Sequence, residues 1–272
     1  MRKLPMPALE DADRIDSLGK NGKHKLAVSL RAEQIKARYV QYQQKQGNPW
    51  KIAEDGSFNE VRLSLNHLYN FPPKGFEFIG EMRKAIDGAC PVCGRDSLGT
   101  LDHYLPKQTY SEFSFFAPNL VPACDRCNTV RKALVRGNVE DERPVHPYFD
   151  EFLNQRVITI LIEPDWNAPR LRPIPHDVEG AIAEVIAWHI ENIILPAGIE
   201  QYLINLWTTL VNRPELYLGT IPSADQVRAR LKQLTEMEAV MCHSPNAWRS
   251  SFYHGLEKNN EAVEYLTGLI AY

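Results

Sequence analysis

Two Cys-x-x-Cys motifs, Cys90/Cys93 and Cys124/Cys127, constrain the fold of this chain more than any other feature of its sequence. Two residues between paired cysteines let both sulfur atoms reach one ion from a tight turn, and four thiolates complete the tetrahedral shell that Zn²⁺ prefers. A closed shell of this kind leaves no position for water or substrate, so we expect the ion to be structural. Chance occurrence of two such motifs is the alternative, and the spacing argues against it.

The 30 residues between the two motifs are more than a compact zinc ribbon needs, so we expect them to form a folded insert. The insert carries Asp102-His103 and Asn119, and Asn128 directly follows the second motif. Histidine can accept a proton near neutral pH, and aspartate offers a hard oxygen ligand suited to Mg²⁺ or Mn²⁺. Because adjacent residues on a strand point to opposite faces, a twisted or bulged hairpin is expected to bring Asp102 and His103 to one site.

In order and spacing these residues resemble the HNH endonuclease family, and more specifically its subgroup in which a Cys₄ zinc ribbon braces a ββα-metal active site. The resemblance covers about residues 88–135. It implies hydrolysis of phosphodiester bonds, with His103 as general base, Asp102 and Asn128 as ligands of a catalytic Mg²⁺ or Mn²⁺, and Asn119 as the residue that orients His103. The sequence departs from the family name at its last position, where Asn128 replaces a histidine, and this leaves the metal preference open.

Each of these residues also has an ordinary structural explanation. Asn119 could cap the turn after Pro118, Asp102 could cap a helix, and a single histidine such as His103 is more often structural. The combination with the cysteine motifs is what favours a metal-dependent nuclease. A zinc-ribbon module that binds nucleic acid without catalysis, and a nuclease that cleaves RNA or tRNA rather than DNA, are the alternatives.

Basic residues close to the motif could contact phosphates. Lys107, Arg131 and Lys132 are the predicted substrate-binding residues. Solvated charges on a helix face would explain any one of them equally well. His146, in the stretch His-Pro-Tyr-Phe-Asp at 146–150, could add a second imidazole to the metal or the leaving group. A packed segment that closes the core is the stronger interpretation of that stretch.

Composition is that of an ordinary globular protein, with 44% hydrophobic and 24% charged residues in a chain of 272. Apolar stretches are short, and no apolar signal core follows the basic start at Met1-Arg2-Lys3. We therefore expect a cytoplasmic protein, in which a reducing environment favours metal binding over disulfide formation. The fifth cysteine, Cys242, is interpreted as a bystander thiol.

Charge is distributed unevenly, with a balance of +4 over residues 1–89, −1 over 90–150 and −6 over 151–272. The acidic C-terminal part would repel a phosphate backbone, so it is a better candidate for packing or for a protein partner. The layout, together with the stretch at 146–150, resembles the PtuB-like HNH subunit of Septu-type and retron-linked antiphage systems. That resemblance implies a DNA-cleaving antiphage effector that acts with an ABC-type ATPase docked on its helical regions.

The pattern predicts a mostly helical α+β protein in three regions. These are an N-terminal helical region at 1–87, a zinc-ribbon nuclease core at 88–150, and a strand followed by an acidic helical region at 151–272. Helices are expected at 27–45, 76–86, 125–136 and 260–271, beyond Pro175, and from a capping box at Ser223. A strand is expected at 156–162.

Overall fold

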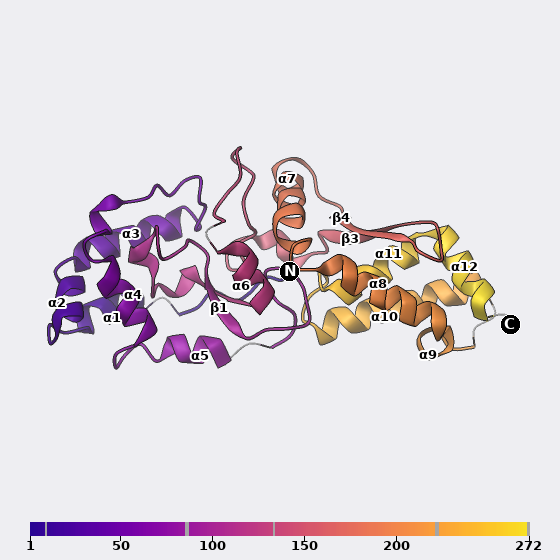
Figure 1. Ribbon diagram of the computed structural model, residues 1–272, viewed down its shortest axis with the longest axis horizontal. Coiled ribbons are helices and arrows are strands. Elements are labelled where there is room, and N and C mark those ends of the chain that lie inside the picture. Colours follow the sequence, from indigo (N-terminus) through magenta and orange to yellow (C-terminus); the bar gives the residue numbers. More distant parts are fainter. Residues whose placement is uncertain (9, 85–86, 133, 221–222, 271–272) are drawn as a thin grey trace. The chain divides into compact units, whose positions relative to one another are not determined.

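The computed structural model describes residues 1–8, 10–84, 87–132, 134–220 and 223–270 (Figure 1). It is an α+β structure in which helices dominate and the strands form two small antiparallel sheets, β1–β2 and β3–β4. Contacts divide the chain into two compact units. The β1–β2 unit comprises Leu4–Asp87 and Leu98–Asp150, and the β3–β4 unit comprises Met1–Lys3, Gly88–Ser97 and Glu151–Tyr272.

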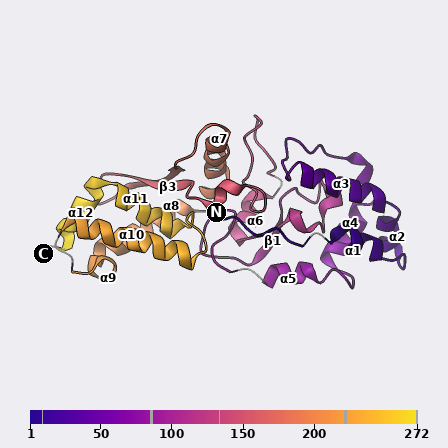
Figure 2. The same ribbon diagram turned by 180° about the vertical axis from the view of Figure 1, so that it is seen from behind.

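The β1–β2 unit surrounds a short hairpin with small helices (Figures 1 and 2). Its elements are α1 (Asp11–Ser17), α2 (Lys23–Ser29), α3 (Ala32–Gln44), η1 (Gly56–Phe58), α4 (Arg62–Asn70), α5 (Phe78–Lys84), β1 (Thr100–His103), η2 (Ser111–Phe113), η3 (Ala117–Asn119), β2 (Leu120–Ala123) and α6 (Asp125–Arg131). Aromatic rings fill the space between α3 and the loop before β2. Tyr39 stacks on Phe116 with 4.0 Å between ring centroids, and Tyr42 meets Phe113 edge-on at 4.9 Å.

The helix expected at 27–45 is two helices, α2 and α3, which meet at Leu30 and Arg31. Ile35 and Tyr39 are buried, whereas Leu30 is 73% exposed and Val40 is 52% exposed. The break places Leu30 at the C-cap of α2, outside the apolar face that α3 turns toward the core.

Gly47 ends the α3 segment in a way that only glycine permits. Its φ is +67°, and a Cβ atom at this position would lie 2.7 Å from the ring of His146. The backbone of Gly47 therefore packs directly against the His146 imidazole, with no room for a side chain between them.

The other expected helices of this unit are shorter in the structure. The helix expected at 76–86 is α5, which ends at Lys84, and the last two expected positions lie outside the described residues. The helix expected at 125–136 is α6, which ends at Arg131 because Lys132 has a φ of +36°. Position 133 lies outside the described residues, and the chain is not helical from Leu134 to Arg136.

The β3–β4 unit contains one hairpin and a set of helices. Its elements are η4 (Glu151–Asn154), β3 (Ile158–Glu163), β4 (Arg170–Pro175), α7 (Gly180–His189), the π-helical turn η5 (Ile190–Ile194), α8 (Ile199–Asn212), α9 (Pro214–Leu218), α10 (Ala224–Met241), α11 (Trp248–Lys258) and α12 (Asn260–Ile270). β3 alternates as the apolar run predicts, with Ile158, Ile160 and Ile162 buried. Helix α11 packs closely on β3, since a Cβ atom on Gly255 would lie only 2.2 Å from the carbonyl oxygen of Ile160.

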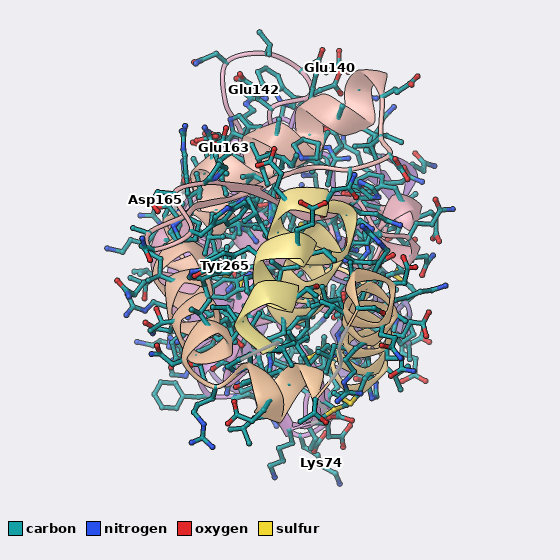
Figure 3. All side chains as sticks on the ribbon, turned by 90° about the vertical axis from the view of Figure 1, so that its right-hand side faces the viewer. Lys74, Glu140, Glu142, Glu163, Asp165 and Tyr265 are labelled. Atoms are coloured by element: carbon teal, nitrogen blue, oxygen red, sulfur yellow. The ribbon has the colours of Figure 1, made fainter. Side chains whose placement is uncertain are left out.

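Two helix starts in this unit follow directly from side chains. Ser223 caps α10 by accepting a hydrogen bond from the N–H of Gln226, which confirms the predicted helix start at Ser223. Asn259 caps α12 by accepting from the N–H of Ala262 (3.0 Å). α12 extends to Ile270, and position 271 of the expected helix lies outside the described residues. Tyr265 of α12, labelled in Figure 3, stacks with Trp166 and Trp207.

The division into two units differs from the three regions expected from sequence. The N-terminal helices share a unit with the β1–β2 hairpin, and the segment Gly88–Ser97 belongs with the C-terminal helices. Within that unit, Trp248 donates through Nε1 to the carbonyl oxygen of Cys93 (2.6 Å), and Nε2 of His189 donates to that of Val92 (2.7 Å). These contacts are long-range in sequence, so local pattern does not show them.

Within the described ranges, no single helix has both the length and the apolar character needed to cross a membrane. The consecutive helical segments Gly180–Ile194 and Ile199–Asn212 are long and apolar enough only when taken together, and the chain bends by 83° between them.

Asp11 is a buried carboxylate that ties α1 to the loop before β2. Its Oδ1 atom accepts a hydrogen bond from the N–H of Ala117 (3.2 Å) and lies 3.3 Å from Nη1 of Arg14, and Tyr39 is close enough to interact with its charge. Burial raises the pKa of Asp11 from 3.8 to about 6, against the lowering effect of these hydrogen bonds and of Arg14.

We predict that Asp11→Asn changes the pH dependence of stability. Because the folded-state pKa of Asp11 lies above its unfolded value, the folded protein binds the proton more tightly, and the contribution of Asp11 to the free energy of unfolding falls as pH rises from about 4 to about 6. Urea unfolding of both proteins across this range should therefore give a difference, wild type minus variant, that declines over pH 4–6 and is constant above about pH 7. A difference that rises with pH would contradict this account of Asp11.

Candidate functional site

Residues 100–132 form a hairpin followed by a helix. β1 and β2 pair antiparallel in regular register, with His103 opposite Leu120, and α6 packs against β1. The chain passes from β2 into α6 through Cys124, whose sulfur accepts from the N–H of Cys127 (3.5 Å) and so caps the helix. Residues 100–131 therefore fold into two strands and a helix, and the helix lies in contact with β1.

A pocket of about 460 Å³ opens beside this hairpin. Five of the predicted site residues line it, namely Asp102, His103, Lys107, Asn128 and Lys132. The rest of the lining is Tyr69, Leu101, Pro106 and Gln108. The expected bulge is not needed to bring Asp102 and His103 together, because His103 is the last residue of β1 and the pairing is regular up to it.

The ring of His103 is held by a backbone carbonyl group. Its Nε2 atom lies 2.8 Å from the oxygen of Ser114, and since a carbonyl oxygen only accepts, Nε2 carries the hydrogen. The lone pair of the neutral ring is therefore on Nδ1. Burial lowers the pKa of His103 to about 3, against the raising effect of the Ser114 hydrogen bond, and the positive charges of Lys107 and Arg83 lower it further. The ring is neutral at physiological pH.

Tyr69 of α4 is a pocket residue that the sequence analysis did not single out. It is 5% exposed and meets the edge of the His103 ring with 4.4 Å between centroids. Its hydroxyl group is within 3.5 Å of the carbonyl oxygen of Leu101. The only sequence signal is an aromatic residue near the end of a helix, 32 residues before Leu101, and this does not indicate a site.

Asp102 and Arg131 form a buried ion pair. Nη1 of Arg131 lies 3.1 Å from Oδ2 of Asp102, and Nη2 donates to the carbonyl oxygen of Tyr104 (2.7 Å). The side chain of Arg131 is 2% exposed, which corrects the expectation that it contacts substrate. Arg131 lies one turn after the buried Cys127 on α6, so it is on the buried face of the helix, where it positions the Asp102 carboxylate.

Asn128 and Lys132 are exposed on α6 and at its end, so their side chains are accessible at the pocket. Lys107 lies on the turn after β1. Its Nζ atom is 4.4 Å from the centroid of the Tyr69 ring and donates to Oδ1 of Asn70 (3.4 Å). Burial lowers the pKa of Lys107, and the charge of Arg83 adds to that effect. Two of the three predicted substrate-binding cations thus line the pocket.

Asn119 does not hold the His103 ring. It is fully buried, and its side chain uses its whole hydrogen-bonding capacity on other groups. Oδ1 accepts from the N–H of Leu105 (2.7 Å) and from the hydroxyl of Tyr42 (3.0 Å), and Nδ2 donates to the carbonyl oxygens of Leu105 (3.0 Å) and Phe113 (3.2 Å). Its position at the end of η3 directs it at the turn after β1, so it holds the loop rather than the imidazole.

His146 belongs to the packed segment at 146–150. It is 1% exposed, and its ring lies 4.0 Å from that of Tyr104 between centroids. Nδ1 accepts from the N–H of Tyr148 (3.3 Å), so the hydrogen of the neutral ring is on Nε2, which lies 3.0 Å from the hydroxyl of Tyr42. A buried relay therefore runs from His146 through Tyr42 to Asn119. His146 does not line the pocket.

The four motif cysteines form a candidate metal centre. Cys90, Cys93, Cys124 and Cys127 are all buried, and their sulfur atoms lie within 4.8 Å of one another. Tetrahedral zinc with sulfurs about 2.3 Å away would place them about 3.8 Å apart, so the group could hold such an ion. The N–H of Arg95 also donates to Cys93 Sγ (3.4 Å), which favours the thiolate form that zinc requires.

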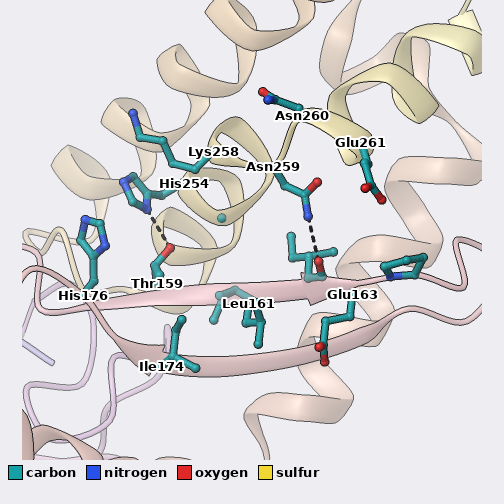
Figure 4. A pocket seen from close by; sticks show the side chains of 14 residues that line it. Thr159, Leu161, Glu163, Ile174, His176, His254, Lys258, Asn259, Asn260 and Glu261 are labelled. Atoms are coloured by element: carbon teal, nitrogen blue, oxygen red, sulfur yellow. Dashed lines mark hydrogen bonds between the residues drawn. The ribbon is translucent and has the colours of Figure 1, made fainter.

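A larger pocket, of about 530 Å³, lies in the β3–β4 unit beside β3 and α11 (Figure 4). Thr159 Oγ1 lies 2.7 Å from Nδ1 of His254, and Asn259 Nδ2 donates to the carbonyl oxygen of Ile162 (2.8 Å). Burial lowers the pKa of His254 to about 4, and Arg156 and His176 act in the same direction. None of the residues predicted from the motif lines this pocket.

We predict that the purified protein carries one zinc ion per chain. Cys93→Ser removes one of four thiolates, and because structural zinc binding is coupled to folding, it should abolish zinc binding and lower the Tm by at least about 5 °C. Cys242→Ser, which alters a buried thiol outside the cluster, is the matched control and should keep its zinc. Metal analysis and thermal unfolding measure both effects, and equal zinc content in the two variants would contradict the assignment.

We also predict that Tyr42→Phe destabilises the protein by about 1–3 kcal/mol, because it removes a hydrogen-bond partner from the buried polar groups of His146 and Asn119. Tyr39→Phe is the matched control. Tyr39 is equally buried on α3, and its hydroxyl has no hydrogen-bond partner in the described part of the chain, so its loss should cost nothing. Denaturant unfolding of both variants tests the difference, and equal stability would argue against the relay.

Part of the chain is similar in sequence to a known protein. Over 100 residues the chain is 41% identical to "Protein ea31" of Escherichia phage lambda. The match covers 35% of this chain and spans about a third, 34%, of the length of that protein. No family model matches the chain, and no solved structure matches it.

Proposed function

We propose that this protein is a metal-dependent endonuclease that hydrolyses phosphodiester bonds of DNA. The observation that carries the proposal is the composition of the pocket beside β1. It brings a histidine, two oxygen-bearing side chains and two lysines to one place, namely His103, Asp102, Asn128, Lys107 and Lys132. Phosphodiester hydrolysis needs an activated water, a cation at the scissile phosphate and stabilisation of the leaving oxygen, and this set offers a group for each.

In this mechanism His103 takes the proton from the attacking water. Its hydrogen is committed to Ser114 on Nε2, which leaves the Nδ1 lone pair as the proton acceptor. Burial keeps the ring neutral and therefore able to accept a proton. The negative charge of a phosphate that enters the pocket would stabilise the imidazolium and raise the pKa of His103 toward the range in which a general base is effective.

Asp102 and Asn128 would hold a divalent cation. A carboxylate and an amide oxygen are hard ligands of the type that Mg²⁺ and Mn²⁺ prefer, and both side chains line the same pocket. The Arg131 guanidinium orients the Asp102 carboxylate from its buried side. When bound, such an ion neutralises the scissile phosphate and stabilises the leaving oxygen.

The biological setting proposed is antiphage defence in the cytoplasm, in which an ABC-type ATPase partner captures or signals the substrate. The supporting observation is the charge distribution. Residues 151–272 have a balance of −6, which suits a protein partner better than a phosphate backbone. The chain as a whole has a net charge of −3, so a partner that delivers DNA to a small basic pocket would compensate for weak general affinity.

We predict that His103→Ala lowers plasmid nicking in Mg²⁺ or Mn²⁺ by at least about 100-fold, the usual contribution of a general base. Asp102→Ala and Asn128→Ala should also lower plasmid nicking relative to wild type, and the loss should be largest at limiting metal concentration. His103→Asn provides a second variant that keeps a polar side chain near Ser114, and unchanged zinc content and Tm show that the variants are folded. His176→Ala, a histidine of the β3–β4 unit, is the control and should cleave like wild type.

The substrate panel should contain duplex DNA, single-stranded DNA and tRNA, with and without a co-purified partner. Preference for tRNA would replace DNA by RNA as the substrate of the same site. Wild type and His103→Ala that are equally inactive with every metal ion, substrate and partner would instead point to a zinc-ribbon module without catalysis.

A further inference from the structure

Two cations of the β1–β2 unit are gathered around a single tyrosine at the edge of the pocket, and one of them lies outside the sequence motif. These are Lys107, on the turn after β1, and Arg83, near the end of α5, and each lies within cation–π range of the ring of Tyr69 on α4. We propose that Arg83 and Lys107 form a phosphate clamp that binds the sugar-phosphate backbone of the substrate beside His103. The inference rests on the proposed nuclease function and names the group that holds its substrate.

The clamp is built on a rigid platform. Nζ of Lys107 lies 4.4 Å and Cζ of Arg83 lies 5.4 Å from the centroid of the Tyr69 ring, within the range of cation–π attraction. The same ring meets His103 edge-on at 4.4 Å. Tyr69 is 5% exposed, so its position is set by packing. One buried ring thus contacts both cations and the candidate base.

Like charges lie close together here, and among the described residues neither Lys107 nor Arg83 is paired with a carboxylate. The charge of Arg83 lowers the pKa of Lys107, and both cations act on His103 in the same direction. In the described part of the chain, Lys107 donates to the neutral amide of Asn70, and Arg83 has neither an ion pair nor a hydrogen bond. Repulsion of this kind is relieved when an anion binds between the two groups. A polyanion is therefore the ligand that this arrangement favours.

The geometry also indicates how the substrate is read. An exposed aromatic ring at a nucleic-acid site would stack on a base. Tyr69 is instead buried against His103 and covered by cations, so it offers no stacking surface. The clamp would contact phosphates alone, and contacts to phosphates position a nucleic acid without reading its sequence. Binding through Arg83 should therefore be independent of base sequence.

The test measures binding separately from cleavage. Fluorescence anisotropy of a labelled 30-base-pair duplex is recorded with His103→Ala, and with otherwise native protein in the absence of added Mg²⁺ and Mn²⁺ as a second background. Arg83→Gln and Lys107→Gln should each weaken binding about 5- to 30-fold at low salt and reduce the slope of log K against log salt by about 0.9. The loss should be the same for duplexes of different sequence.

Lys84→Gln is the matched control. Lys84 is the next residue on α5, is equally exposed and carries the same charge. It should change affinity less than about twofold and leave the salt slope unchanged, because it makes no contact with the Tyr69 platform. Tyr69→Leu should weaken binding and make the effect of Arg83→Gln smaller, since the platform that positions the arginine is then gone.

The outcomes separate this inference from the proposed function. Equal effects of Arg83→Gln and Lys84→Gln, an effect that depends on base sequence, or an absence of duplex binding by the parent protein would each overturn the clamp. Cleavage that persists with unchanged affinity in Arg83→Gln would overturn the clamp and leave the nuclease intact. Binding that depends on Arg83, in a protein that cleaves nothing, would support the clamp and refute the nuclease.

Discussion

The turn after β1 is held in place by one buried amide, and the arrangement of the candidate site depends on it. Asn119 satisfies both backbone groups of Leu105, the carbonyl group of Phe113 and the hydroxyl of Tyr42. An unmade hydrogen bond at this depth would cost more than a made one contributes, so the loop has one conformation in which every partner is present. That conformation places Lys107 at the pocket and the carbonyl group of Ser114 on the His103 ring.

The charges around the pocket are mainly positive, although the net charge of the chain is negative. The whole sequence carries −3, yet the groups that act on His103 are positive, and the buried acid of the site, Asp102, is already paired with Arg131. His103 itself is buried, so these charges act on its ring more strongly than they would in water. A small region can therefore attract phosphate while the rest of the protein does not, which is consistent with specific capture rather than general coating of nucleic acid.

Much of the candidate site was predictable from the spacing of residues 90–132. The cysteine cluster and the convergence of Asp102, His103 and Asn128 on one pocket follow from motif order. The direction of side chains was not predictable. Arg131 turned inward and Asn119 turned away from His103, because helical phase and loop geometry decide which way a polar residue points. The secondary structure was also predicted in part. The positions of β3 and of the start of α10 were predicted, but the break between α2 and α3 was not.

The sequence by itself determined the chemical inventory: four cysteines at zinc-binding spacing, with Asp102, His103, Asn119 and Asn128 between and beside them. Only the tertiary structure decided which residues support them. Tyr69 lines the pocket from a helix outside the motif, and Arg83 lies against the Tyr69 ring from another. His146 and Tyr42, which are distant in sequence from each other, support Asn119. The reason is physical, because ligand spacing is a local property of the chain, whereas burial and charge at a site are set by residues that only folding brings together.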